Sequence, residues 1–102
     1  MIDIQIQPIP NQSFTFVADD TSFNVTFKTT NDRTIADFVI NDDIAINGIR
    51  VMPNKPIIPY PYLEYGNFFF VSNGEIYPFY TDFGISQNLV YLTVGEMNDY
   101  RN

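Results

Sequence analysis

The sequence contains no cysteine, no histidine and no tryptophan among its 102 residues. Without cysteine the chain can form no disulfide, no thiolate nucleophile and no thiolate zinc site. Without histidine it lacks the one side chain that titrates near neutral pH at its ordinary pKa, and it lacks imidazole metal ligands. Ser-His-Asp and Cys-His catalytic arrangements are therefore excluded.

Positive charge is scarce, with Lys+Arg 5 against Asp+Glu 12 and a formal net charge of -7. The basic residues form no cluster along the chain; they are Lys28, Arg33, Arg50, Lys55 and Arg101. An acidic surface repels nucleic-acid phosphates. We therefore expect no nucleic-acid partner.

Long apolar runs are also missing, although hydrophobic residues make up 45% of the chain. No run approaches the roughly 20 residues that a membrane helix needs, so we expect no membrane partner. Residues 1–4 contain no basic n-region, so we expect no secretory signal. Because single domains typically have about 100–150 residues, we expect one domain.

The residue types present favour β-strands. Ile, Val, Phe, Tyr and Thr together supply 45 residues, whereas Ala, Leu, Met, Glu, Lys, Arg and Gln supply 21. β-Branched and aromatic side chains fit a pleated, half-buried surface and lose rotamer freedom in helices. Apolar and polar residues also alternate, as at Phe23, Val25 and Phe27, and this period of two is typical of strands.

The sequence predicts an all-β fold of about seven short strands, arranged as a single small barrel or a two-sheet sandwich. The expected strands cover residues 2–6, 13–18, 22–29, 34–40, 44–46, 68–71, 75–80 and 88–94. Hairpins are expected around residues 18–21 and around residues 41–43. Asn47-Gly48 is a strong turn signal, after which residues 49–51 resume the sheet. The all-β domain is expected to span residues 1–94, with a polar C-terminal tail at 95–102.

One segment differs in composition, because four prolines fall within residues 52–62. Proline cannot serve a helix interior or a central strand, so we expect an ordered, extended loop there. The continuous apolar run at 68–71 indicates a strand buried on both faces, with at least one of Phe69 and Phe70 fully buried.

The tyrosines of this loop are candidates for an interface. A stiff loop has little conformational entropy left to lose on docking, and tyrosine is enriched at interface cores. The predicted interface residues are Arg50, Pro53, Asn54, Pro59, Tyr60, Tyr62 and Tyr65. Arg50 is expected to pair with an acid of a neighbouring protein or with Glu64 of the same chain.

The sequence offers few candidate residues for catalysis or metal binding. Residues 42–48 contain two aspartates and an asparagine before Gly48, but they lack the spacing of a calcium loop, so we interpret them as a hairpin turn. Glu64, Glu75 and Asp82 could supply a glycosidase-like carboxylate pair. Twelve acids scattered over a β-protein produce such pairs by chance, so we expect no catalytic residue, metal or cofactor.

Three stretches in order carry a family resemblance over roughly residues 4–93. The first is Ile-Gln-Pro-Ile-Pro-Asn-Gln-Ser-Phe at 6–14. The second combines Ile-Asn-Gly-Ile-Arg at 46–50, Pro-Asn at 53–54, Ile-Ile-Pro-Tyr at 57–60 and Leu-Glu-Tyr-Gly-Asn-Phe at 63–68. The third combines Tyr-Pro at 77–78, Tyr80, Phe-Gly at 83–84 and Gln-Asn-Leu-Val-Tyr-Leu at 87–92. Together they resemble the baseplate plug proteins of contractile-tailed bacteriophages.

The resemblance implies a non-enzymatic, all-β structural subunit of the virion near the centre of the tail baseplate. It implies contacts with hub and spike proteins, with wedge proteins as a further candidate, in a symmetric multi-copy assembly built in the host cytoplasm. Two other functions stay open at this stage. They are a β-module that binds carbohydrate or peptide through exposed tyrosines, and a carboxylate-dependent hydrolase.

Overall fold

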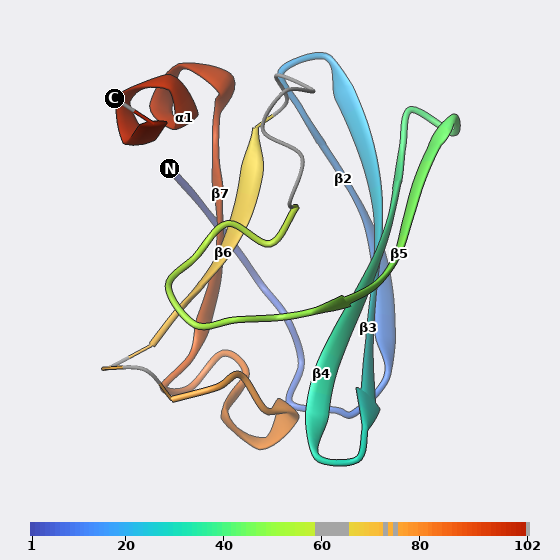
Figure 1. The fold of residues 1–102 in the computed structure, drawn as a ribbon, viewed down its shortest axis with the longest axis vertical. Helices are drawn as coiled ribbons and strands as arrows, with labels where there is room; N and C mark the ends of the chain where they lie inside the picture. Colours follow the sequence, from blue (N-terminus) through green and yellow to red (C-terminus); the bar gives the residue numbers. More distant parts are fainter. Residues whose placement is uncertain (59–65, 73, 75, 102) are drawn as a thin grey trace.

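Seven strands in two antiparallel sheets form the computed structural model of the chain (Figure 1), which describes residues 1–58, 66–72, 74 and 76–101. The elements in chain order are β1 (Ile2–Ile4), β2 (Gln12–Ala18), β3 (Thr21–Thr30), β4 (Arg33–Ile40), β5 (Ile44–Arg50), β6 (Asn67–Val71), the 3-10 helix η2 (Tyr80–Asp82), β7 (Asn88–Leu92) and α1 (Val94–Arg101). One sheet has the order β2-β3-β4-β5 and the other β1-β7-β6. The all-β prediction is confirmed, and the architecture is a sandwich, not a closed barrel.

The four-stranded sheet is a meander because each of its three turns contains two consecutive Asn or Asp residues that tolerate a left-handed backbone. The pairs have φ values of 53° and 58° at Asp19-Asp20, 49° and 62° at Asn31-Asp32, and 54° and 56° at Asn41-Asp42. Paired positive φ angles give the turn a twist that matches the right-handed twist of the flanking strands. The hairpins predicted around residues 18–21 and 41–43 are confirmed.

The core between the sheets is largely aromatic, and Phe68 of β6 lies at its centre. Phe23 and Phe38 of the four-stranded sheet lie 5.1 and 5.5 Å from Phe68 between ring centroids, and Tyr91 of β7 lies 5.2 Å away. Phe68, Phe23, Phe38 and Tyr91 are all 0% exposed. Aromatic pairs in such tilted or edge-on contacts contribute about 0.5–1.5 kcal/mol each beyond the area that they bury.

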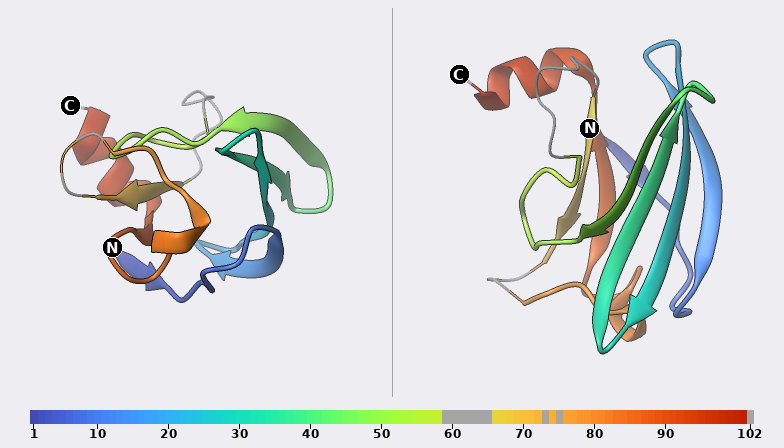
Figure 2. Two further views of the ribbon diagram at one scale, coloured as in Figure 1. Left: turned by 90° about the horizontal axis from the view of Figure 1, so that it is seen from below. Right: turned by 45° about the vertical axis from the view of Figure 1, so that its right-hand side comes forward.

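The opposite face of β6 is also buried. Phe69 packs with Val90 of β7 and Met97 of α1 in a second, smaller cluster, and Phe69 is 7% exposed. Phe70 faces the main core at 0% exposure. The prediction of a strand buried on both faces is therefore confirmed for residues 67–70, whereas Val71 is 44% exposed. Figure 2 shows α1 at one end of the three-stranded sheet, where Met97 covers Phe69.

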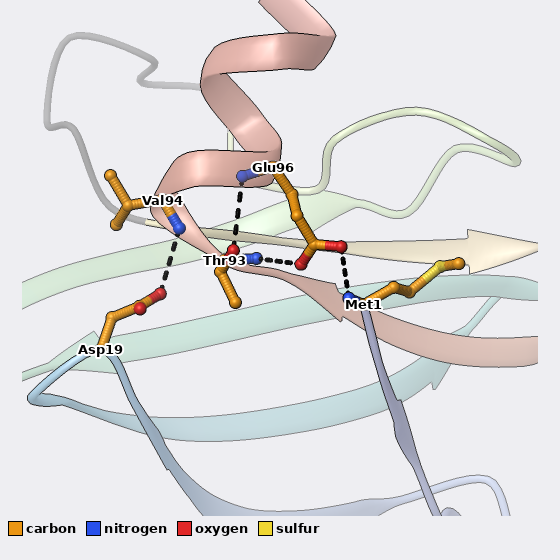
Figure 3. A network of polar contacts seen from close by, with 5 residues as sticks. All are labelled: Met1, Asp19, Thr93, Val94 and Glu96. Atoms are coloured by element: carbon orange, nitrogen blue, oxygen red, sulfur yellow. Dashed lines mark hydrogen bonds and ion pairs between the residues drawn. The ribbon is translucent and has the colours of Figure 1, made fainter.

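The helix α1 occupies the segment that was expected to be a polar tail. Thr93 and Glu96 form a capping box, in which the Thr93 N–H donates to Glu96 Oε1 at 3.0 Å and the Glu96 N–H donates to Thr93 Oγ1 at 3.3 Å (Figure 3). This arrangement satisfies two backbone donors at the helix start. Thr-x-x-Glu is a sequence signal for a helix start that the apolar pattern alone did not reveal.

The turn between β2 and β3 holds α1 in place through Asp19. Asp19 Oδ2 accepts hydrogen bonds from the Tyr91 hydroxyl at 2.9 Å and from the Val94 N–H at 3.1 Å. Burial raises the pKa of Tyr91 far above its ordinary value, and the hydrogen bond to Asp19 raises it further. The Met1 ammonium group pairs with Glu96 beside this contact (Figure 3).

Two sequence-based expectations about the sheets are wrong. Asn47-Gly48 is not a turn, because Gly48 lies inside β5 at φ 72°, where the register between β4 and β5 shifts. The Gly48 N–H donates to Asp37 Oδ1 at 2.7 Å, so a side chain of β4 stabilises a bulge and the strand continues to Arg50.

The expected strand at 75–80 is also absent from its described residues. The Phe79 N–H donates to Gln87 Oε1 at 2.9 Å, and Gln87 Nε2 donates to the Tyr77 carbonyl at 3.1 Å. Thr34 Oγ1 donates to the Pro78 carbonyl at 2.7 Å. Side chains therefore satisfy this backbone in place of a neighbouring strand, and the segment leads into η2.

The contact between Asp19 and α1 gives a testable stability difference. Asp19→Ala should lower the free energy of unfolding by about 1–3 kcal/mol more than Asp20→Ala, because only Asp19 bonds Tyr91 and Val94. Both replacements put alanine at a positive φ, so the backbone cost is shared. Urea denaturation of both variants measures the difference, and equal losses would contradict the role of Asp19.

The Asp37 carboxylate gives a pH-dependent prediction. Lys28 Nζ lies 2.6 Å from Asp37 Oδ2, and this contact, with the Gly48 N–H, lowers the Asp37 pKa. The stabilisation of the folded state by the ionised Asp37 carboxylate is complete above the pKa of an unfolded aspartate, about 3.9. It is lost as the pH falls through the lower pKa of Asp37 in the folded protein.

Asp37→Asn should therefore cost about 1 kcal/mol at pH 7, and this cost should shrink below about pH 4. Asp43→Asn is the matched control, because it removes the same charge from an exposed turn residue. Unfolding curves at several pH values measure both variants. A cost for Asp37→Asn that stays constant down to pH 2 would show that the ion pair contributes nothing.

Candidate docking surface

The chain crosses from one sheet to the other after β5, and the described part of the proline-rich segment lies along β6 (Figure 1). The Asn54 N–H donates to the Phe70 carbonyl at 2.8 Å, and the Ile57 N–H donates to the Phe68 carbonyl at 2.9 Å. Pro53 and Phe70 also form an isolated β-bridge. These contacts fix residues 53–57 against the outer edge of β6.

Asn67 fixes the end of this segment. Asn67 Oδ1 accepts from the Ile58 N–H at 2.8 Å, and Asn67 Nδ2 donates to the Ile58 carbonyl at 2.8 Å. Asn67 is 3% exposed, so its amide is buried and fully used. A β-carbon at Gly66 would overlap the Tyr91 hydroxyl, so the chain enters β6 where only glycine fits. Asn67 thus links Ile58 to the start of β6.

The structure places the described members of the predicted interface as follows. Arg50 is exposed, whereas Pro53 is buried. Asn54 is exposed at φ 56°, and its side chain donates to the Gly74 carbonyl at 2.7 Å and accepts from the Ser72 N–H at 3.0 Å. Pro59, Tyr60, Tyr62 and Tyr65 lie outside the described residues, as does Glu64. The interface stays a prediction.

Arg50 has a partner within the chain that the sequence did not reveal. Its guanidinium carbon lies 4.5 Å from the centroid of the Tyr77 ring, which is a cation–π contact. Tyr77 is 44% exposed. The sequence around Tyr77 does not predict this contact, because the position of Tyr77 beside Arg50 depends on the fold of the segment before η2.

Lys55 and Met52 extend this contact into a small surface, which we name the Arg50–Tyr77 patch: Arg50, Met52, Lys55 and Tyr77. A cavity of about 60 Å³ lies between Met52, Pro53, Lys55 and Tyr77. No acid of the described residues forms an ion pair with Arg50 or Lys55, whereas Lys28 pairs with Asp37. In a chain of net charge -7, the patch therefore presents two cations and an aromatic ring.

The acidic residues of the described chain form no site of their own. No group of three His, Cys, Asp or Glu residues in this part of the chain could hold a metal ion. Residues 41–43 form the turn between β4 and β5, and Asp42 Oδ1 accepts from Asn24 Nδ2 of β3 at 3.4 Å. Glu64 and Glu75 lie outside the described residues, so the carboxylate pair is not tested. Among the residues described, no helix has the length and apolar character needed to cross a membrane.

A larger groove of about 380 Å³ lies on the outer face of the three-stranded sheet. Its lining includes Met1, Asp3, Gln5, Val71 and Val90, and none of its described lining residues is aromatic. The described lining of this groove therefore offers no aromatic ring for stacking.

Comparison with known proteins assigns the chain to a family. A comparison with curated proteins gives no match. The family model described as cyanophage baseplate Pam3 plug gp18 matches residues 1–95, which include both sheets and the base of the proline-rich loop. The chain therefore belongs to the phage baseplate plug family, whose members are structural proteins of the virion tail.

Proposed function

We propose that this protein is a non-enzymatic plug subunit that contacts hub and spike proteins at the centre of the baseplate. Wedge proteins are further candidate neighbours, in a symmetric assembly with several copies. The protein would reach this position from the host cytoplasm, where tails assemble. The family supports association with other baseplate components, and the docking surface is our inference from the chain.

The docking surface that we propose combines the loop of residues 53–65 with the Arg50–Tyr77 patch. The observation that carries it is the Arg50–Tyr77 contact at 4.5 Å, which places an exposed guanidinium group over an aromatic ring. A stacked guanidinium group keeps its N–H donors for a carboxylate of another protein. Arginine and tyrosine are also the residue types enriched at interface hot spots.

The base of the loop supports the same surface. Hydrogen bonds anchor the described part of the segment at two places. The Asn54 N–H bonds the Phe70 carbonyl, and the Asn67 side chain bonds the backbone of Ile58. A side chain on such a base loses less conformational entropy on docking than one on a free segment. The acidic character of the rest of the chain makes the two cations of the patch the natural contact for an acidic neighbour.

A charge reversal tests the patch. Arg50→Glu should reduce the amount of this protein in assembled particles about 30-fold, the effect of losing a hot spot worth about 2 kcal/mol. Arg33→Glu is the matched control, because Arg33 is an exposed arginine at the start of β4. Quantitative mass spectrometry of purified tails, after complementation of a deletion phage, gives the ratio to the spike.

Normal incorporation of a folded Arg50→Glu variant would place the docking surface elsewhere. Absence of the wild-type protein from particles, with abundance in lysates, would overturn the structural function itself.

The tyrosines of the loop give a second test. Tyr60→Ala combined with Tyr62→Ala should leave the melting temperature of the isolated protein unchanged and remove it from assembled baseplates, because interface tyrosines contribute to binding and not to the core. Circular dichroism melting is measured beside complementation. Unfolding of the double variant would show that these side chains belong to the core. Quenching of the wild-type tyrosine fluorescence by soluble sugars would favour a carbohydrate-binding module instead.

A further inference from the structure

The two sheets have four edge strands, and three of them are protected against pairing with another chain. β1 has only 3 residues, and the segment containing Asn54 and Ile57 is hydrogen-bonded along β6. β5 carries the bulge at Gly48 and ends in Arg50. Short strands, coverage, bulges and charges are the usual means by which proteins prevent pairing at sheet edges.

β2 has none of these features. Its sequence is Gln-Ser-Phe-Thr-Phe-Val-Ala over 7 residues, without charge, proline or glycine. It pairs with β3 in unbroken register from Gln12↔Phe27 to Ala18↔Thr21, and among the described residues no strand lies on its other side. Val17 is 67% exposed. β2 is therefore an open edge.

The register determines which backbone groups face outward. Ala18 and Thr21 close the two-residue turn Asp19-Asp20, and such a turn begins with a hydrogen-bonded pair. Hydrogen-bonded and non-hydrogen-bonded pairs alternate along an antiparallel ladder. The N–H and carbonyl groups of Ser13, Thr15 and Val17 therefore point away from β3, toward the open edge.

The strand is also nearly symmetric about Thr15, with Phe14 and Phe16 on either side. Both phenylalanines face the sandwich but are only partly buried, because they lie at its open side. An antiparallel copy of β2 centred on Thr15 would place Phe14 of one chain opposite Phe16 of the other, twice. Such cross-strand aromatic pairs contribute about 0.2–1 kcal/mol each.

We infer that β2 pairs antiparallel with β2 of a second copy of this chain, about a two-fold axis through Thr15. The pairing would join two four-stranded sheets into one continuous sheet. β2 has no charged residue, and antiparallel pairing places the acidic turns at Asp19-Asp20 at opposite ends of the contact. This inference does not depend on the docking surface proposed above.

We expect a weak dimer, because a single pair of strands buries less than the roughly 1,200–2,000 Å² of stable interfaces. The two-fold axis nevertheless makes a strict geometric demand. The two Thr15 residues form a hydrogen-bonded pair with Cα atoms about 5.5 Å apart. A disulfide spans Cα separations of about 4.4–6.8 Å.

The absence of native cysteine makes cross-linking a clean test. Purified Thr15→Cys protein, mildly oxidised, should form a covalent dimer on non-reducing gels. Ala45→Cys, on the exposed side of the protected edge β5, is the matched control and should stay monomeric. Equal cross-linking of the two variants, or none in Thr15→Cys, would overturn the inference.

Two further cysteines test the register. Ser13→Cys and Val17→Cys mixed together should form a heterodimer. Neither variant alone should form a disulfide-linked homodimer, because the two copies of the same position lie four residues, roughly 13 Å, apart along the paired strands. Homodimers of either variant would overturn the two-fold at Thr15. Cross-linking of Thr15→Cys to a different tail protein in particles, without a dimer in solution, would assign the edge to that protein.

A non-covalent measurement checks the same contact. Thr15→Lys should abolish concentration-dependent dimerisation in sedimentation velocity, because it opposes two ammonium groups at the axis. Thr15→Val should keep it. Both variants lose the same hydrogen bond from Thr15 Oγ1 to Asn24 Oδ1, so the comparison isolates the edge. Dimerisation of the lysine variant at the wild-type concentration would contradict the pairing.

Discussion

The burial of β6 on both faces is the constraint on which the rest of this structure depends. Phe68 and Phe70 fill the core between the sheets, and Phe69 faces the other way under Met97. A strand with apolar side chains on both faces requires a layer on each side of it. The four-stranded sheet supplies one layer, and on the other side Met97 of α1 covers Phe69 and Val90, while Val71 is 44% exposed.

The same constraint explains why buried amide side chains replace strand pairing at several positions. The segments before and after β6 pass close to the core, where an unpaired backbone group is costly. Asn67 bonds the backbone of Ile58, and Gln87 bonds the backbone of Tyr77 and Phe79. Asn67 is 3% exposed and Gln87 is 1% exposed, so both amides form these hydrogen bonds away from solvent. The loops beside β6 are therefore anchored without lengthening the sheet.

This architecture suits a structural protein. The chain has no cysteine or histidine for chemistry, and its family is structural. The surfaces that we propose for contact with neighbours are an anchored segment, a small cationic patch in an acidic chain, and the open edge of β2. These features lie on different elements, because the patch begins at Arg50, the last residue of β5, and the open edge is β2.

The sequence by itself determined the features that depend on local residue type and on short periods. These are the strand content, the hairpin turns at 18–21 and 41–43, the two-sided burial of the strand that begins at Phe68, and the family. Each rests on neighbours within a few positions, so a pattern along the chain is sufficient to predict it. The capping box of α1 was also present in the residues, but Gly95 and the weak apolar repeat obscured it.

Only the tertiary structure decided the features that depend on residues far apart in the chain. Gly48 forms a bulge and not a turn because the carboxylate of Asp37 on the neighbouring strand binds its N–H. Residues 76–79 form no strand because Thr34 and Gln87 satisfy their backbone. Arg50 stacks on Tyr77, and β2 is left at an edge, through the order in which the strands pack. Local propensity permits more than one outcome at these positions, and the partner brought close by the fold selects one.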